Sequence, residues 1–114
     1  MKSISFALTE RQFLDGSKNV TRRLGWKTLK PGDRLRAVRK AMGLKRGEHP
    51  VVLGEIEVVS VHREPLLAIT TRPGDCGREG FPEMTPLEFV AFFCREMRVG
   101  ALHTVTRIKF RRIS

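Results

Sequence analysis

Apolar and polar residues alternate along several stretches of the chain, and this period of two predicts β-strands. In one stretch Ile108 and Phe110 lie between basic residues, and the longest stretch contains Gly54, which we expect to mark a β-bulge. The predicted strands cover residues 3–8, 18–24 after an initial turn, 34–39, 51–64 and 104–113.

One helix has a strong local signal. Thr85 is expected to cap its N-terminus, Pro86 suits the first helical position, and Glu88 completes a capping box. The helix is predicted to continue to Met97, with apolar residues along one side.

A shorter helix is predicted over residues 10–15. Thr9 would be its N-cap, with Gln12 as the capping-box partner and Gly16 as the C-terminal stop. Glycine, proline and charged residues are frequent in two further segments, which we expect to be loops: residues 41–50 and 70–80.

This order of elements predicts an α+β fold. Turns and loops join most of the strands, rather than regular crossover helices, which favours a mostly antiparallel sheet. We expect a single domain over residues 1–114, in which the sheet curls into a small β-barrel flanked by two or more helices.

The positive charge of the chain is concentrated in one segment. The sequence has 22 Lys and Arg against 12 Asp and Glu, and half of these basic residues lie between Lys18 and Arg46 with one acid, Asp33. Nucleic acid is the expected partner of such a segment. A membrane is not expected, because the sequence has no apolar run of about 18 residues, and we predict a cytoplasmic monomer.

Several residues of the basic segment are candidates for RNA or nucleoside binding. Trp26 could stack on a base or cap the barrel core, and Arg23 could bind a phosphate or order the site. The complete predicted set is Arg22, Arg23, Trp26, Lys27, Arg36, Arg39 and Lys40. Cys76 and Cys94 are interpreted as free thiols, and no metal or cofactor is expected.

The pattern Gly16-x-Lys18-x-x-Thr21-x-Arg23 resembles the signature of ASCH domains, a PUA-like β-barrel family. The resemblance extends over essentially the whole chain, through Pro31-Gly32-Asp33, Glu79-Gly80-Phe81 and the order of the elements. The resemblance implies binding of RNA or modified nucleosides in a cleft beside the barrel. A small bacterial branch, which also has threonine in the signature, consists of amidohydrolases that cleave N4-acetylcytidine.

The resemblance also implies a catalytic set of Lys18, Thr21 and Glu79, with Glu83 as the rival for the third position. A threonine hydroxyl is a poor nucleophile unless a base removes its proton, and lysine is such a base only when its pKa is lowered. The positive charges of Arg22 and Arg23 would contribute to that lowering. The attacking group would be Thr21 itself or a water activated by Lys18.

Two other functions fit the sequence. The first is a non-catalytic module for single-stranded RNA, in which the basic segment contacts phosphates. The second is a metal-independent ribonuclease in which Lys18 and a neighbouring residue act on the 2′-hydroxyl and the phosphate. The usual pair of histidines is absent from the local sequence, but the fold could bring His62 or His103 to the site.

Overall fold

The computed structural model describes residues 1–41 and 43–114, so Met42, inside the expected loop 41–50, lies outside the described residues. It has five strands in one sheet, in the order β1-β3-β4-β5-β2. The strands are β1 (Ser3–Ser5), β2 (Val20–Arg23), β3 (Arg34–Val38), β4 (Val52–Pro65) and β5 (Thr104–Arg112). The helices are α1 (Glu10–Leu14), the 3-10 helix η1 (Leu66–Thr71), α2 (Asp75–Arg78) and α3 (Pro86–Met97).

The sheet is an open, curled half-barrel of mixed strands. Three neighbouring pairs are antiparallel, but β1 runs parallel to β3. We predicted a mostly antiparallel sheet that curls into a small barrel, whereas the sheet is mixed and the barrel is open. The α+β class and the curled sheet are confirmed. The chain makes α1 and the far edge strand β2 before it returns to β3, and so long a connection permits parallel pairing.

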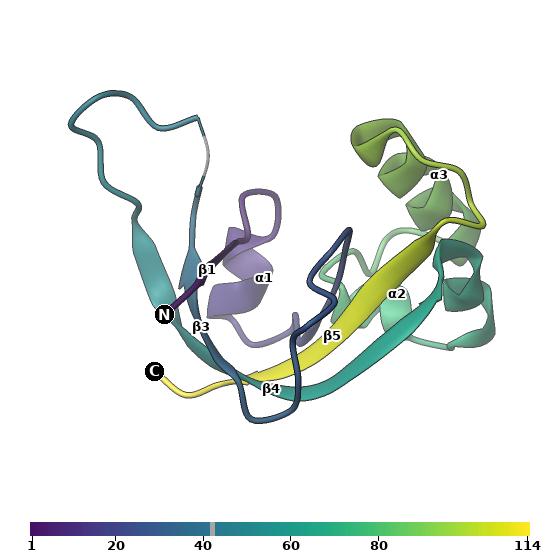
Figure 1. Cartoon of the computed structure of the whole chain (residues 1–114). Coiled ribbons are helices and arrows are strands. Elements are labelled where there is room, and N and C mark those ends of the chain that lie inside the picture. The colour runs from purple at the N-terminus through teal and green to yellow at the C-terminus, as the bar shows by residue number, and fades with distance from the viewer. Residues whose placement is uncertain (42) are drawn as a thin grey trace.

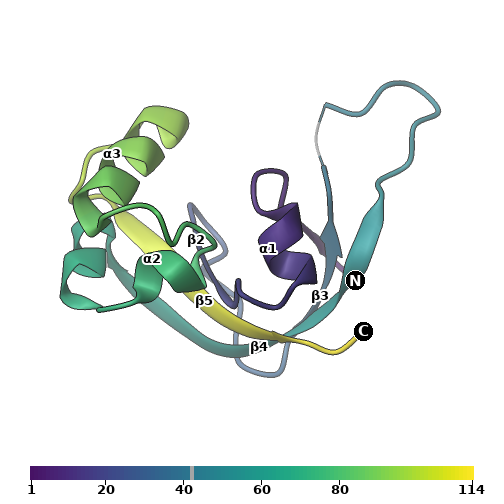
Figure 2. The same cartoon turned by 180° about the vertical axis from the view of Figure 1, so that it is seen from behind.

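The helices lie in two places on the curved sheet. Figure 1 shows α1 over the hollow side of the half-barrel, while α2 and α3 gather at one end, beside β5. Figure 2 shows the same separation from behind. The segment 70–80, predicted to be a loop, instead contains the end of η1 and the short helix α2.

Two bulges bend β4, the longest strand. Ala37 pairs with Gly54 and Val38 with Val52, so that Leu53 is the extra residue and the predicted bulge at Gly54 is confirmed next to it. A second irregularity follows between Val58 and Ser60. Bulges increase the local twist, which curls the sheet around α1.

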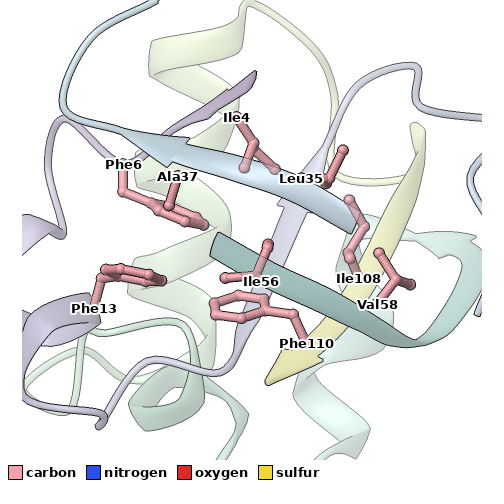
Figure 3. Packing of buried hydrophobic residues seen from close by; sticks show 9 residues of the cluster. All are labelled: Ile4, Phe6, Phe13, Leu35, Ala37, Ile56, Val58, Ile108 and Phe110. Atoms are coloured by element: carbon pink, nitrogen blue, oxygen red, sulfur yellow. The ribbon is translucent and has the colours of Figure 1, made fainter. Parts of the chain in front are cut away.

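The first hydrophobic core fills the hollow of the half-barrel. Figure 3 shows the side chains of Phe6, Phe13 and Phe110 beside one another among aliphatic residues from the strands. The Phe6 ring stacks on Phe13 with centroids 5.1 Å apart and on Phe110 at 5.5 Å. This core attaches α1 to the sheet and thereby fixes the direction of the chain as it enters β2.

A second core lies under α3. Leu66 and Ile69 of η1 pack with Phe89, Phe93 and Val105 in it. The capping box of α3 is present as predicted, because Thr85 Oγ1 accepts from the backbone N–H of Glu88 and the Glu88 carboxylate accepts from that of Thr85.

None of the helices in residues 1–41 and 43–114 is long and apolar enough to cross a lipid bilayer.

The predicted cap of α1 is absent. Thr9 makes no side-chain hydrogen bond to the helix and is buried instead. The helix lasts only from Glu10 to Leu14 and is held by Phe13 in the first core. Its end at Gly16, with φ of 83°, follows the prediction, since glycine adopts this left-handed conformation without strain.

Candidate functional site

Lys18 lies in the turn between α1 and β2, and its side chain is buried. The turn is fixed because the Lys18 backbone N–H donates to the carbonyl of Gln12 at 3.0 Å. The ammonium Nζ donates to the Glu79 carbonyl at 2.6 Å and lies 3.5 Å from Glu79 Oε1. It also lies 5.5 Å from the centroid of the Phe6 ring. Only 4% of this residue is exposed, which is rare for a lysine.

Burial strongly perturbs the amine of Lys18. Desolvation is the largest cause, and it lowers the pKa of Lys18 from its ordinary value of 10.5 to about 8. The carboxylate of Glu79 opposes the change, while the positive charges of Arg23 and Arg22 add to it. An amine with this pKa exists in a useful fraction as the neutral base near neutral pH.

Thr21 lies on β2 and points into the hollow of the half-barrel. Its backbone pairs with Ile108 of β5, a residue of the first core, and its side chain is buried. Arg23 Nε donates to Thr21 Oγ1 at 2.9 Å, and Arg23 NH2 donates to the Ser5 carbonyl at 2.5 Å. The threonine oxygen is therefore held in place by a guanidinium that is itself anchored to β1.

Glu79 follows α2 and connects Lys18 with Arg22. Its Oε2 accepts from Arg22 NH1 at 3.0 Å, and the residue is 3% exposed. Arg22 NH2 donates on its other side to Asp75 Oδ2 and lies 3.7 Å from Glu64 Oε2. Buried charges need such partners. The guanidinium of Arg22 thus binds the carboxylates of Asp75 and Glu79, one at each end of α2.

A cavity of about 260 Å³ brings these groups together. Its polar part is formed by Lys18, Thr21, Arg22, Arg23 and Glu79, together with Ser5 and Thr9. Apolar side chains line the remainder, and they come from the segment before α1 and from the region of α3: Phe6, Ala7, Leu8, Phe81, Phe89, Phe92, Phe93 and Met97. The arrangement presents an amine, a hydroxyl and a carboxylate to one side of a pocket whose apolar part is mainly aromatic.

The structure separates the three predicted catalytic residues from most of the predicted binding residues. Lys18, Thr21 and Glu79 all line the cavity, whereas the rival Glu83 is exposed and does not. Among the predicted binding residues, Arg22 and Arg23 also line it, but the guanidinium of Arg22 is buried in contact with carboxylates.

The other predicted binding residues lie outside the cavity. Trp26 is half-buried against the first core, with a φ of 54° and Lys2 Nζ 6.0 Å from its ring. Arg39 forms a two-point ion pair with Glu10, at 2.8 and 2.9 Å. The remaining residues are exposed: Lys27, Arg36 and Lys40.

Sequence reasoning missed the aromatic wall and the buried carboxylate Asp75. Phe89, Phe92 and Phe93 follow the i, i+3, i+4 spacing of one helix face, so that their convergence could have been inferred from the predicted helix. Asp75 lies in a segment expected to be a loop, and no local signal distinguishes it from the other acids.

No group of three or more His, Cys, Asp or Glu suited to a metal ion occurs within residues 1–41 and 43–114.

No protein-family model and no curated protein matches the sequence. The fold is similar to a crystal structure of a protein of the DUF984 family from Enterococcus faecalis V583. The TM-score is 0.59 at 14% sequence identity, over 92% of this chain and 69% of that chain. At this identity the similarity concerns the fold alone.

Proposed function

We propose that this chain is an amidohydrolase that removes the acyl group from an N-acylated cytidine, using Lys18, Thr21 and Glu79. One observation supports the proposal most directly: a buried lysine with a pKa of about 8 shares an aromatic-walled cavity with a threonine hydroxyl and a carboxylate. Titratable groups with strongly perturbed pKa values in a cavity are typical of catalytic sites.

The proposed reaction begins with the neutral amine of Lys18. It accepts the hydroxyl proton of Thr21 as Oγ1 forms a bond to the amide carbon, and the resulting ammonium gives this proton to the departing N4 nitrogen as the C–N bond breaks. Cytidine leaves, and the acyl group remains as an ester on Thr21. Water then attacks the ester carbon, Lys18 takes the water proton, and Thr21 Oγ1 regains a proton as the acid is released.

Arg23 and Glu79 have supporting roles in this scheme. The Arg23 N–H that already donates to Thr21 Oγ1 would stabilise negative charge that develops on this oxygen. Glu79 accepts hydrogen bonds from both Lys18 and Arg22, which suits a carboxylate that orients Lys18 and the attacking water. The aromatic wall would stack on the pyrimidine ring and exclude bulk water.

The charge arrangement favours a neutral nucleoside over an RNA chain in this cavity. Lys18 and Arg22 share Glu79, and Arg22 is also paired with Asp75, so these two cations offer little net charge to a phosphate. Arg23, the third cation that lines the cavity, is hydrogen-bonded to the Thr21 hydroxyl and the Ser5 carbonyl. Outside the cavity Arg39 is paired with Glu10, and Arg36 lies opposite Glu55 across the β3–β4 pair. His62 and His103 are exposed and do not line the cavity, which leaves the ribonuclease scheme without a histidine at Lys18.

Hydrolysis of N4-acetylcytidine, with EDTA present, tests the proposal. The wild type should release cytidine and acetate in equal amounts, separated by liquid chromatography. Lys18→Met and Thr21→Val preserve side-chain size but remove the base and the nucleophile, and each should reduce kcat/KM by about 100-fold or more.

Matched controls separate chemistry from folding in this assay. Lys45→Met and Thr28→Val make the same substitutions at exposed positions outside the cavity and should retain wild-type turnover. If turnover is retained in Thr21→Val but lost in Lys18→Met, the attacking group is a water activated by Lys18 and not the threonine hydroxyl. Absence of turnover in the folded wild type would reject the proposal.

A further inference from the structure

A second cavity lies on the other face of the sheet from the first core. It is about 510 Å³ in volume, and its lining residues come from β4 and β5 on one side and from the chain between η1 and α2 on the other. Four cations and two hydroxyls line it: Arg72, Arg78, Arg107, Lys109, Ser60 and Thr71. We call it the basic groove. It shares no lining residue with the cavity around Lys18, and the predicted binding residues do not include any of its cations.

Two guanidiniums of the basic groove are held in fixed positions. Arg107 donates to Asp75 twice, through Nε at 3.2 Å and NH2 at 2.9 Å. Arg78 NH1 donates to the Pro73 carbonyl at 3.0 Å and to Asp75 at 3.3 Å. Each arginine retains further N–H groups, and a preorganised guanidinium loses less side-chain entropy on binding an anion.

The acids near the basic groove do not balance its positive charge. Asp75 is the only acid among the residues that line the groove, and its carboxylate also accepts a hydrogen bond from Arg22 on the interior side. Glu64 pairs with Arg72 at 2.9 Å but also lies 3.7 Å from Arg22. Lys109 adds a further charge at an exposed position of β5. The groove therefore has an excess of positive charge.

Asp75, the carboxylate at the base of the groove, does not become neutral by taking up a proton. Burial alone would raise the pKa of Asp75, but hydrogen bonds from Arg107 and Arg22 outweigh this effect and hold the pKa well below its ordinary value of 3.8. Asp75 thus stays ionised and keeps Arg107 oriented across the physiological pH range.

We propose that the basic groove binds a phosphoryl group, supplied by the terminal phosphate of a nucleotide or by a phosphodiester of single-stranded RNA. A phosphate has several acceptor oxygens that point in different directions, and it can accept from guanidiniums on opposite walls at the same time. The hydroxyls of Ser60 and Thr71 are additional donors of the kind that contact phosphate oxygens. This inference is independent of the proposed hydrolase activity.

Titration of the isotope-labelled protein, followed by NMR, tests the inference. The probes are inorganic phosphate, cytidine 5′-monophosphate, cytidine, and a short single-stranded RNA with hydroxyl ends. At least one phosphoryl-containing probe should shift the amide signals of residues 71–78 and 107–109, whereas cytidine should leave these signals unchanged. Binding should weaken as the salt concentration rises.

Substitutions at exposed positions identify the groove as the binding site. Lys109→Ala and Arg78→Ala should each weaken binding of the probe about tenfold. Lys45→Ala and Arg46→Ala remove the same charges from another exposed part of the molecule and should change the affinity by less than about twofold.

The results also distinguish the source of the phosphoryl group. Binding of the monophosphate alone assigns the groove to a terminal phosphate, and binding of the RNA alone assigns it to a phosphodiester. Equal weakening by the groove variants and the control variants would overturn the inference, since it would show binding through net charge only. So would the absence of shifts in residues 71–78 and 107–109 with every phosphoryl-containing probe.

Discussion

Burial gives Lys18 the property that an exposed lysine lacks. Its ammonium has exchanged water for one carbonyl, one carboxylate oxygen and the face of Phe6. These contacts do not fully replace hydration, and the two neighbouring arginines add repulsion, so that the neutral amine is favoured. The same physical cause makes the residue a base and connects its protonation to folding.

The stability of the protein should therefore depend on pH through Lys18. The unfolded chain binds this proton with a pKa of 10.5 and the folded chain with a pKa of about 8. Between these pH values the unfolded state holds more protons, so the free energy of unfolding should rise by about 3 kcal/mol as pH increases from 8 to 10.5. Below pH 8 both states hold the proton, so the gain in unfolding free energy is absent there.

Urea unfolding of the wild type and of Lys18→Met at several pH values measures this contribution. The difference in unfolding free energy between the two proteins should change by about 3 kcal/mol over the interval, with the wild type gaining as pH rises. The sequence has no tyrosine to titrate in the same range, and both proteins share every other lysine and cysteine. A difference that stays constant with pH would contradict a lowered pKa for Lys18.

Local sequence could locate Lys18 and Thr21 but not their surroundings. Their spacing after a short helix can be recognised from neighbouring residues, and the structure has the predicted turn at Gly16. Glu79 was expected from a family resemblance only, because 61 residues separate it from Lys18 along the chain. The ion pairs of Arg22 with Asp75 and Glu79 depend on tertiary packing, which no local pattern of charges specifies.

Among the elements, those with complete local signals agree best with their predictions. The helix α3 has a cap, a proline at its first turn and an apolar face within its own sequence, and it begins and ends as predicted. The helix α2 has four residues, one of them Gly77, and the 3-10 helix η1 before it has six. Such elements form only because the second core and the Asp75 ion pairs hold them, so their sequences alone indicate a loop.

Gly80 controls how closely α1 approaches the chain after α2. A Cβ at this position would lie 3.0 Å from Thr9 Cγ2 and 3.2 Å from Gln12 Cβ, and the backbone has a φ of 97°. Gly80→Ala should therefore destabilise the protein by about 1–3 kcal/mol and displace Glu79, the adjacent residue, from Lys18.

Gly77→Ala is the matched control for this element. A Cβ at Gly77 would meet no atom within 4 Å, so this substitution should leave thermal stability unchanged or slightly improved. Thermal unfolding of both variants compares the two positions, and hydrolysis by Gly80→Ala reports on Glu79. Equal stability of the two variants would show that the contact between α1 and Gly80 does not constrain the fold.

Across the whole molecule, one carboxylate joins elements that are distant along the chain. Asp75, which begins α2, pairs with Arg22 of β2 and with Arg107 of β5, and it lies between the cavity around Lys18 and the basic groove. Both arginines are mostly buried, so their charges depend on carboxylate partners more than surface charges would, and Asp75 is the partner that they share.

Asp75→Asn should therefore be costly despite its small change in shape. It removes the carboxylate that pairs with Arg107 and one of the two that accept hydrogen bonds from Arg22, whose pair with Glu79 remains. It should reduce the free energy of unfolding by about 3–5 kcal/mol. Asp15→Asn, at an exposed turn where a side-chain oxygen accepts from Ser17 N, should cost less than about 1 kcal/mol. Chemical denaturation compares the two, and a small effect at Asp75 would mean that the buried ion pairs contribute little to stability.

The topology of the sheet was the hardest feature to predict. Alternation identifies strands but does not state which strands become neighbours, and the parallel pairing of Ile4 with Ala37 is a contact across 33 residues. The hydrophobic residues of β1 and β3 could have met in either direction. The bulges in β4 and the placement of α1 in the hollow select the observed arrangement.

An open half-barrel has two edges, and their lengths affect how this protein behaves at high concentration. An exposed edge strand offers unpaired N–H and C=O groups to the strands of other molecules, and long edges promote intermolecular sheet formation. Here the long strands, β4 with 14 residues and β5 with 9, lie inside the sheet. The edges are β1 and β2, with 3 and 4 residues. The side chain of Arg23 in β2 donates to the Ser5 carbonyl in β1, so this acceptor already has a partner. Edges this short offer few unpaired backbone groups, so they are poor templates for sheet formation between molecules.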